Sequence, residues 1–325
     1  MTPADLSLTV LHAVRRAVDE GALRVEVPPR VKVERPRAGG VGDYASSVAL
    51  GLARPAGLDA RAVAAILRER LDPHPGIRAV EITGPGFLNF TLDEQDDTRV
   101  VRRVLAEGLR YGYSTALSGT RPRLRPAAEP RAGLVTDTVL RLLRAQGADA
   151  RLDPDGELIP VLPVPCETYE TYEAIGDDAA RWALLRPAAH HLALAPAPLL
   201  VQHERNPLFR VRYAHARAHR LVANGAQLGV TPRYEQPVDA PRLLTLLGDH
   251  PDVLLSAARL RAPDRVARHL ESVADALLAF QHTVLPLGDE KPSAAHRSRL
   301  ALAEAAGTVL AGGLSLLGIS APDQI

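Results

Sequence analysis

The segment 206–220, with the sequence NPLFRVRYAHARAHR, places arginines, aromatic rings and histidines close together in the chain. At about 100° per residue, Arg210, Tyr213, Arg217 and Arg220 fall on one flank of a helix. Guanidinium groups pair with phosphates, and both guanidinium planes and phenol rings stack on unstacked bases. The pattern indicates a surface for nucleic acid, while a solvated charged face is the simpler interpretation of the stripe taken alone.

The two histidines of this segment raise the question of a metal site. His215 and His219 are four residues apart, a spacing that two metal ligands on one helix can have. No carboxylate accompanies them at a suitable spacing, and His215 falls on the apolar side of the helix with Leu208 and Val211. We therefore interpret His215 as a core or partner-facing histidine, and we expect no metal ligands.

The rest of the chain offers few residues for catalysis or cofactor binding. Cys166 is the only cysteine, which excludes a disulfide within the chain and a cysteine-based zinc site. The glycines of AGGVG at 38–42 lack the strand–loop–helix context of a dinucleotide site. We expect no catalytic residue, no cofactor and a cytoplasmic location, since a chain without disulfides suits a reducing compartment.

The composition favours helices and gives the chain little net positive charge. Apolar residues make up 46% of the chain and aromatic residues 4%, so the core must be built from Ala, Leu and Val, which suits helices. The net charge is only +1, so binding of nucleic acid requires a local basic patch. The N-terminal sequence is typical of an amphipathic helix, and no stretch approaches the ~20 apolar residues that span a bilayer. We expect no membrane contact.

Periodicity predicts the elements that must position these residues. An α+β domain with an antiparallel sheet is expected over residues 1–95, followed by a short α/β spacer and an all-α helical bundle from about Gly176. The expected helices lie at 44–53 (capped by Asp43), 59–71, 96–111 and 132–146, the expected strands lie at 23–27, 30–34 and on both sides of 84–86, and a hairpin is expected at 148–162.

Both ends of the chain resemble parts of one family. GDDAARWALL at 176–185 and NPLFRVRYAHAR at 206–217, with the tail LSLLGISAPDQI, are similar to the DALR-type anticodon-binding domain of arginyl-tRNA synthetase. GGVGDYASSVALGLA at 39–53 and GPGFLNFTL at 84–92 resemble the additional N-terminal domain of the same family. The resemblance implies tRNA as a partner, held at its anticodon arm and at its elbow.

The resemblance also implies roles for particular residues. In the family, the aromatic residue and the Asn of the second N-terminal motif approach a base of the tRNA D-loop, and these positions are Phe87 and Asn89. Phe87 could equally be a core strand residue, and Asn89 a strand-edge residue. In the bundle, Gln281 follows Phe280 where the family leads us to expect a tyrosine, so we expect that anticodon specificity has drifted.

The middle of the chain departs from the family. Gly119 to Gly176 spans 57 residues (176 − 119), whereas a βαβ unit alone takes ~30 residues, so the nucleotide-binding catalytic domain cannot fit. The place of the HIGH-type signature, 127–135, contains no histidine, and no lysine lies between Val33 and Glu290 for the KMSKS-type signature. Because such cations stabilise the transition state, we expect that the chain is not an enzyme.

These observations predict three domains: an N-terminal additional-domain-like region at 1–115, a degenerate catalytic remnant or spacer at 116–175, and the DALR-type bundle at 176–325. Our hypothesis is a non-catalytic arginyl-tRNA synthetase paralogue, a pseudoenzyme that binds an arginine-acceptor tRNA. The alternative is a protein-interaction module that pairs with the true synthetase or another factor. RNA binding predicts a strong salt dependence, and protein binding predicts an exposed apolar patch.

Overall fold

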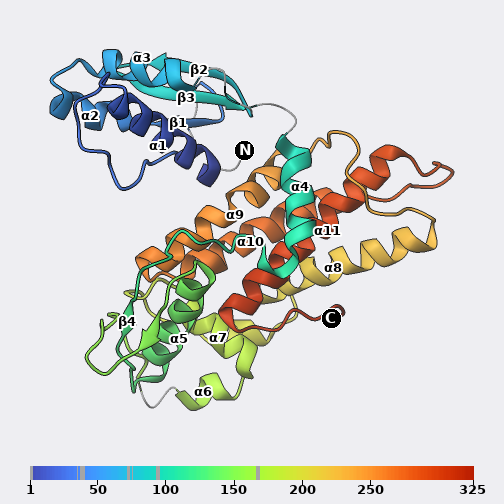
Figure 1. Cartoon of the computed structure of the whole chain (residues 1–325). Helices are drawn as coiled ribbons and strands as arrows, with labels where there is room; N and C mark the ends of the chain where they lie inside the picture. Colours follow the sequence, from blue (N-terminus) through green and yellow to red (C-terminus); the bar gives the residue numbers. More distant parts are fainter. Residues whose placement is uncertain are drawn as a thin grey trace. The chain divides into compact units, whose positions relative to one another are not determined.

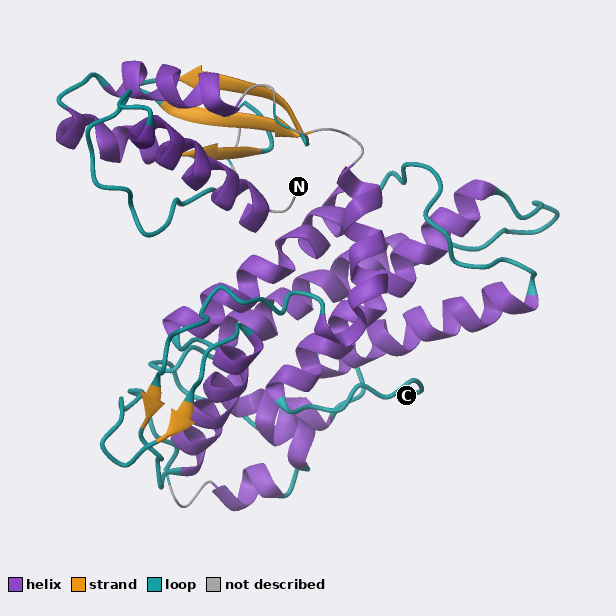
Figure 2. Ribbon diagram, in the orientation of Figure 1, coloured by secondary structure: helices purple, strands orange, loops and turns teal. Residues whose placement is uncertain are grey.

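The computed structural model describes residues 3–34, 36, 41–71, 74, 76–92, 96–165 and 169–325 (Figure 1). Cys166 and the glycines at 39 and 40 lie outside the described residues. The chain divides into two compact units, Met1–Val100 and Val101–Ile325. The first unit combines helices with a sheet, and the second consists mainly of helices (Figure 2).

The first unit is an α+β fold, as predicted. Its elements are α1 (Pro3–Asp19), β1 (Tyr44–Ser46), α2 (Val48–Ala56), α3 (Ala60–Leu71), β2 (Ile77–Thr83) and β3 (Phe87–Leu92). The strands form an antiparallel sheet in the order β1-β3-β2. Because side chains alternate along a strand, Leu88 and Phe90 of β3 share one face and are fully buried in the core with residues of the three helices. Phe87 and Asn89 belong to the opposite face.

The expected strands at 23–27 and 30–34 are wrong. In this segment one isolated antiparallel bridge joins Glu34 to Ala45 of β1, and the Lys32 carbonyl accepts the Ser46 hydroxyl at 2.8 Å. Pro28 and Pro29 interrupt the segment and have no N–H group to donate to a ladder. The alternating valines instead pack against the core, so the sequence pattern records burial and not strand pairing.

The expected helix over 44–53 is also wrong at its beginning. Residues Tyr44–Ser46 pair with β3 as β1, and the helix α2 begins only at Val48. Asp43 does not cap a helix: its Oδ2 accepts the backbone N–H of Leu92 at 2.8 Å and so fastens the end of β3. The pairing of Tyr44–Ser46 with the distant strand β3 therefore overrides the local signal for a helix cap at Asp43.

The second unit is the predicted helical bundle, built around its last helix. Its helices are α4 (Asp96–Glu107, beginning in the first unit), α5 (Pro130–Ala145), α6 (Tyr169–Glu173), α7 (Asp177–Leu185), α8 (Pro207–Gln227), α9 (Pro241–Leu260), α10 (Asp264–Phe280) and α11 (Ala294–Leu317). Figure 1 shows α11 among α8, α9 and α10, and it packs against all three. Contrary to expectation, α11 is long and apolar enough to cross a membrane, but most of it is buried as the core helix of the bundle.

The expected hairpin at 148–162 is wrong. The strand β5 (Arg151–Leu152) pairs in parallel with β4 (Arg123–Leu124), and a further parallel bridge joins Leu124 to Glu157. The helix α5 connects the two strands, so residues 123–152 form a small β–α–β fragment. Parallel pairing requires such a crossover, whereas a hairpin does not.

The division into two units differs from the three predicted domains. The segment after α4 belongs to the helical unit, because the 3₁₀ turn η1 (Gly108–Arg110) packs on α11 and the Tyr111 hydroxyl donates to the Leu247 carbonyl at 2.9 Å. The helix α5 packs against α9 and α7. Residues 116–175 therefore belong to the same compact unit as the bundle. The assignment of these residues as a remnant or spacer stays a prediction.

Candidate nucleic-acid interface

The helix that carries the arginine stripe, α8, begins at a well-formed cap. Asn206 Oδ1 accepts the backbone N–H groups of Leu208 at 3.0 Å and Phe209 at 3.2 Å, and Pro207 occupies the first helical position. The Asn206 amide also donates to the carbonyls of the preceding turn, at 2.9 and 3.0 Å. The cap fixes where the helical register begins, and hence where each arginine points.

The opposite side of α8 is fixed by packing. Leu208 and Val211 are buried, as the sequence predicts, and so are Ala218 and Leu221. Gly307 of α11 permits a close approach, because a Cβ there would lie 2.8 Å from the Cβ of Ala218. The helix therefore cannot rotate to change which side chains face outward without disturbing the core.

The four predicted residues of α8 differ in how they are held. Arg210 Nε lies 2.8 Å from Oδ1 of Asp275, so its charge is partly compensated. Arg217 Nε donates to the neutral amide oxygen of Gln281 at 2.6 Å, and Arg220 is exposed. Among the described residues, no carboxylate pairs with Arg217 or Arg220.

An aromatic pair lies on the same flank. The rings of Phe209 and Tyr213 stack, with centroids 5.8 Å apart and planes inclined by 15°. Tyr213 is 41% exposed, so one part of the stacked pair is accessible. An exposed ring beside guanidinium groups is the combination that binds unpaired bases and their phosphates.

The histidines of α8 have a carboxylate partner that sequence reasoning missed. Asp323 reaches them from the C-terminal tail, with 3.5 Å between Oδ1 and His215 Nε2 and 3.7 Å between Oδ2 and His219 Nε2. His215 is buried, and its Nδ1 lies 3.1 Å from the carbonyl oxygen of Gly307. Within the described parts of the chain, no group of three or more His, Cys, Asp or Glu side chains is arranged to hold a metal ion.

The tail is fastened by the DALR-type signature itself. Asp178 accepts the backbone N–H of Ser320 at 3.0 Å and also its hydroxyl, and Arg212 of α8 lies 3.6 Å from the same carboxylate. Arg212 also donates to the Ser320 hydroxyl at 3.2 Å. The signature thus has a structural task here, which is to join α7, α8 and the C-terminus.

The two predicted residues of the first unit share one face of β3 but are not equally accessible. Phe87 is 37% exposed at the start of the strand. Asn89 is only 5% exposed, and its amide donates to the Thr83 hydroxyl at 2.6 Å. It occupies the central strand, opposite Ala45 and Glu81, and not a sheet edge. Phe87 offers a ring to a ligand, and Asn89 is held within the sheet.

Sequence reasoning missed a buried arginine in the segment where the family's HIGH-type signature was sought. Arg131 is fully buried and donates to four backbone carbonyls, those of Leu162, Leu184, Ala188 and His191, at 2.7–3.2 Å. Burial lowers the pKa of this guanidinium. No local pattern could reveal the position, because the acceptors lie 31–60 residues away in the chain.

Glu129, which is half-buried, lies two residues before Arg131 and has its own set of hydrogen bonds. Burial opposes its ionisation, but hydrogen bonds from the Tyr169 hydroxyl and from the N–H groups of Ala132 and Val164 prevail and lower its pKa. Burial and the same contact raise the pKa of Tyr169. The hydrogen bonds of Arg131 and Glu129 that the structure records are all made within the protein, and they hold α5 against the following loops.

Two family matches bear on this geometry. Residues 8–92 match the family described as "Arginyl tRNA synthetase N terminal domain". Residues 211–325, which include most of α8 and the tail, match the "DALR anticodon binding domain". The chain is related to arginyl-tRNA synthetase. It carries the family's N-terminal domain and its anticodon-binding domain, in that order, as the resemblance implied.

Comparison with individual proteins also relates the chain to this synthetase family. The chain is 24% identical to the arginine–tRNA ligase of Pseudarthrobacter chlorophenolicus over 554 aligned positions that cover 100% of both chains. It is 41% identical to that of Micrococcus luteus over 164 residues, which cover 46% of this chain and 30% of the relative. The arginyl-tRNA synthetase of Thermus thermophilus has the same fold, with a TM-score of 0.72, 14% identity and coverage of 100% of both chains.

The length of the alignment also shows how much shorter this chain is than a relative that it matches. An alignment of 554 positions contains the 325 residues of this chain, so at least 229 positions (554 − 325) have no counterpart here. The chain therefore lacks a full-length catalytic domain of the family.

The prediction that the chain is not an enzyme is nevertheless wrong. The ligases of Pseudarthrobacter chlorophenolicus and Frankia alni, the latter 26% identical, align over the whole of this chain. A missing signature shows only that a motif is absent, whereas chemistry depends on which groups meet in three dimensions. The relatives do not exclude an enzyme.

Proposed function

We propose that the chain binds tRNA, with an arginine acceptor as the preferred species, and that the exposed flank of α8 takes the anticodon arm. One observation carries the proposal: Arg217 is oriented by the neutral amide of Gln281 beside the accessible ring of Tyr213, within the anticodon-binding domain. A guanidinium held in this way keeps its full charge for a phosphate.

The four side chains have separate proposed tasks. Arg217 and Arg220 neutralise backbone phosphates, because neither is paired with a described carboxylate. Tyr213 stacks on an unpaired base, a contact worth ~1–3 kcal/mol. Arg210, already paired with Asp275, contributes less charge and holds the flank against α10.

In the first unit, Phe87 and Asn89 are proposed to meet the tRNA elbow. The 37% exposure of Phe87 suits stacking on a D-loop base. Asn89 is proposed to contribute indirectly, by holding the strand that carries Phe87, because its amide already donates to the Thr83 hydroxyl. Under this proposal the elbow contact depends on Phe87 for affinity and on Asn89 for the shape of the strand.

The proposal is tested by equilibrium binding of the whole chain to an arginine-acceptor transcript and to a transcript for another amino acid, each across a salt series. Binding to the arginine acceptor is expected to be micromolar or tighter and to weaken steeply with salt, because phosphate contacts release counterions. Equal affinity for both transcripts would remove the acceptor preference and leave tRNA binding. Absence of binding at low salt would overturn the proposal.

A second candidate function is docking to a protein, with an arginyl-tRNA synthetase as the first partner to try. It is favoured by exposed apolar side chains in the loop that follows α7, where Leu192 is 75% exposed and Leu200 and Val201 are 61% and 55% exposed. Exposed apolar groups of this kind mark interaction surfaces when they form a patch. Replacing Leu200 and Val201 by Ser would weaken such a complex and leave the salt-dependent tRNA affinity unchanged.

A further inference from the structure

The small parallel sheet of the helical unit gathers arginines on one face. Figure 2 shows its strands β4 and β5 as two short arrows side by side, and Arg123 of β4 is the direct neighbour of Arg151 in the register. Arg121 and Arg125 lie two residues to either side of Arg123. Because side chains alternate along an extended strand, these positions belong to the same face. The residues Arg121, Arg123 and Arg125 are called the arginine ladder below.

Backbone hydrogen bonds on both edges hold the stretch that carries the arginine ladder. On one edge, alternate carbonyls of residues 120–124 accept N–H groups of residues 149–153 at 2.8–3.1 Å. On the other edge, the Arg123 carbonyl accepts the Glu157 N–H at 2.7 Å. Gly156 permits this approach, because a Cβ there would lie 2.6 Å from the Arg123 carbonyl oxygen. The stretch is therefore a fixed extended strand, and the three arginines keep a common direction.

The two faces of this sheet differ in burial. Leu124, which points away from the arginine ladder, is fully buried. Arg121, Arg125 and Arg151 are exposed, and Arg123 is partly exposed. Parallel sheets are usually covered, and apolar, on both faces. This sheet instead has one core face and one face that presents guanidinium groups to solvent.

Carboxylates on the neighbouring strands are engaged by other arginines. Asp149 pairs with Arg151, with 3.0 Å between Oδ1 and Nε, so the charge of Arg151 is partly compensated. Glu157 Oε2 accepts a hydrogen bond from Arg261 Nη2 at 2.9 Å. These two carboxylates therefore leave the three charges of the arginine ladder to another partner.

We propose that the arginine ladder binds the sugar–phosphate backbone of the tRNA, as a second contact surface outside α8. Alternate residues of a strand are about 6–7 Å apart, so three guanidinium groups in a straight row can follow successive phosphates of one RNA strand. The planar fork of each guanidinium matches the oxygens of a phosphate. The inference rests on the proposed tRNA binding. Because the same unit is proposed to hold the anticodon arm, RNA is favoured over an acidic peptide as the partner.

The arginine ladder lies apart from the proposed anticodon surface within the helical unit. Figure 1 shows β4 beside α5 at one end of this unit, and the C-terminal half of α8 toward the other end. Substitutions on one surface therefore leave the side chains of the other in place, and the two contacts can be tested separately.

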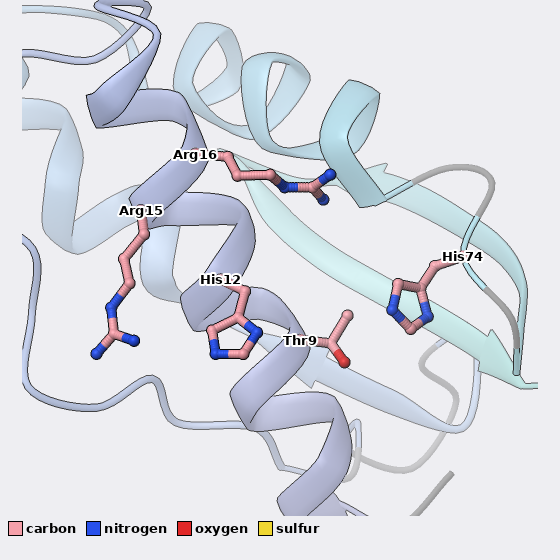
Figure 3. A pocket seen from close by; sticks show the side chains of 5 residues that line it. All are labelled: Thr9, His12, Arg15, Arg16 and His74. Atoms are coloured by element: carbon pink, nitrogen blue, oxygen red, sulfur yellow. The ribbon is translucent and has the colours of Figure 1, made fainter.

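Basic side chains in the cavity of the first unit diverge instead (Figure 3). This cavity of about 420 Å³ lies beside α1, and Arg15 extends on the side of α1 away from His74. Arg16 donates to the backbone carbonyl of Arg70. A common face for three guanidinium groups is therefore a property of the arginine ladder and not of this cavity.

The test uses the whole chain and the double variant Arg121→Gln with Arg125→Gln, which removes two exposed charges and keeps the backbone hydrogen bonds of the strand. The matched control is Arg242→Gln with Arg265→Gln, at two exposed arginines of α9 and α10. An arginine-acceptor transcript is titrated across a salt series. We expect the double variant to bind about tenfold more weakly at low salt, with a slope of log affinity against log salt that is smaller by about 2. The control should change both quantities much less.

A second variant tests the same face through a gain of affinity, which a misfolded chain would not show. Asp149→Asn removes the carboxylate that pairs with Arg151 and frees this fourth guanidinium for a phosphate. We expect tRNA binding to strengthen by about two- to fivefold at low salt. Glu173→Gln, at an exposed carboxylate of α6, makes the same change of charge and should have little effect.

The outcomes separate this inference from the proposed function. If the double variant binds tRNA as its control does and Asp149→Asn brings no gain, the arginine ladder is not an RNA contact, even where Arg217→Glu weakens binding. If the unchanged chain does not bind tRNA, both proposals are overturned. Poly-glutamate is titrated in parallel. Poly-glutamate binding that is lost in the double variant, together with unchanged tRNA binding, would assign the ladder to an acidic protein and overturn the RNA contact.

Discussion

Arg217 of α8 donates its Nε hydrogen to the amide oxygen of Gln281 at 2.6 Å, and this bond joins two helical segments that are 64 residues apart in the chain. Gln281 begins the 3₁₀ turn η4 (Gln281–Thr283) directly after α10. The family resemblance led us to expect a tyrosine at this place. A neutral amide orients the guanidinium and leaves its charge uncompensated, which links the departure from the family to the proposed phosphate contact.

Substitution of Gln281 by Glu is therefore expected to reduce tRNA affinity. The carboxylate would pair with Arg217 and place a negative charge beside the phosphate, so a loss of about five- to tenfold is expected at low salt. Gln281→Ala, which removes the orienting bond but adds no charge, should cost less. Fluorescence anisotropy with a labelled transcript measures both, and equal affinity of the Glu variant and the unchanged chain would contradict the arrangement.

Removal of the buried guanidinium of Arg131 is expected to destabilise the helical unit. Arg131→Met leaves four carbonyl acceptors without their donor, which predicts a loss of about 3–5 kcal/mol in the free energy of unfolding. Chemical denaturation followed by circular dichroism measures it. Arg125→Met, at an exposed arginine of the same segment, is the control and should change stability by less than about 0.5 kcal/mol.

Acid should destabilise the helical unit through a buried histidine pair. His250 stacks on Tyr111 with ring centroids 5.9 Å apart and lies 5.2 Å from His269. Burial lowers the pKa of His269 from 6.5 to about 4, and burial together with the neighbouring ring lowers the pKa of His250 well below 6.5. Both rings are therefore neutral in the folded state at neutral pH.

The direction of the pH effect follows from these pKa values. Between pH 6.5 and pH 4, His269 binds a proton in the unfolded chain but stays neutral in the folded chain. The free energy of unfolding is therefore highest above pH 6.5 and decreases as the pH falls toward 4. His269 alone should account for about 3 kcal/mol across this interval. The variant His269→Phe should flatten the acid limb of a denaturation series, and an acid limb that is unchanged would show that other groups control it.

Two glycine substitutions are expected to have opposite effects on stability, because only Gly307 lies at a close contact, that of α8 with α11. Gly307→Ala forces the new Cβ to within 2.8 Å of Ala218 Cβ, so a loss of about 1–3 kcal/mol is expected. Gly51→Ala in α2 meets nothing within 4 Å and should raise the stability of the first unit by up to about 1 kcal/mol. Thermal unfolding of both variants tests the packing, and a neutral Gly307→Ala would contradict it.

The sequence predicts well those features that depend on local order. The 3.6-residue period predicts the helix α8 that carries the arginine stripe, and the turn at Gly84–Gly86 separates β2 from β3 as expected. Local patterns fail where a distant partner decides. Tyr44–Ser46 becomes a strand because β3 pairs with it, and residues 151–152 pair with β4 across a helix.

In the candidate interface too, the sequence alone does not reveal contacts with distant residues. The types and spacing of Arg210, Tyr213, Arg217 and Arg220 are visible in the sequence, but their partners are not. Asp275, the partner of Arg210, and Gln281, the partner of Arg217, come from elements far along the chain. Which arginine keeps its charge free, and which is compensated, could therefore be learned only from the packing of α8 against α10 and the tail.

Tyrosine 213 gives a prediction that separates stacking from charge. Tyr213→Leu keeps an apolar side chain against Phe209 but removes the π-face, so tRNA affinity should fall about fivefold to a hundredfold while the salt slope stays the same. Tyr213→Phe retains the ring and should bind nearly as well as the unchanged chain. If Leu and Phe variants bind alike, Tyr213 does not stack on a base.

The most direct measurement is the dissociation constant of the whole chain for an arginine-acceptor transcript at low salt, for Arg217→Glu and for its control Arg242→Glu, an exposed arginine of α9 with the same change of charge. We predict at least about a tenfold loss for Arg217→Glu, together with a smaller salt slope, and a much smaller change for Arg242→Glu. Equal losses for the two variants, or no binding by the unchanged chain, would contradict the assignment of α8 as the tRNA-binding surface.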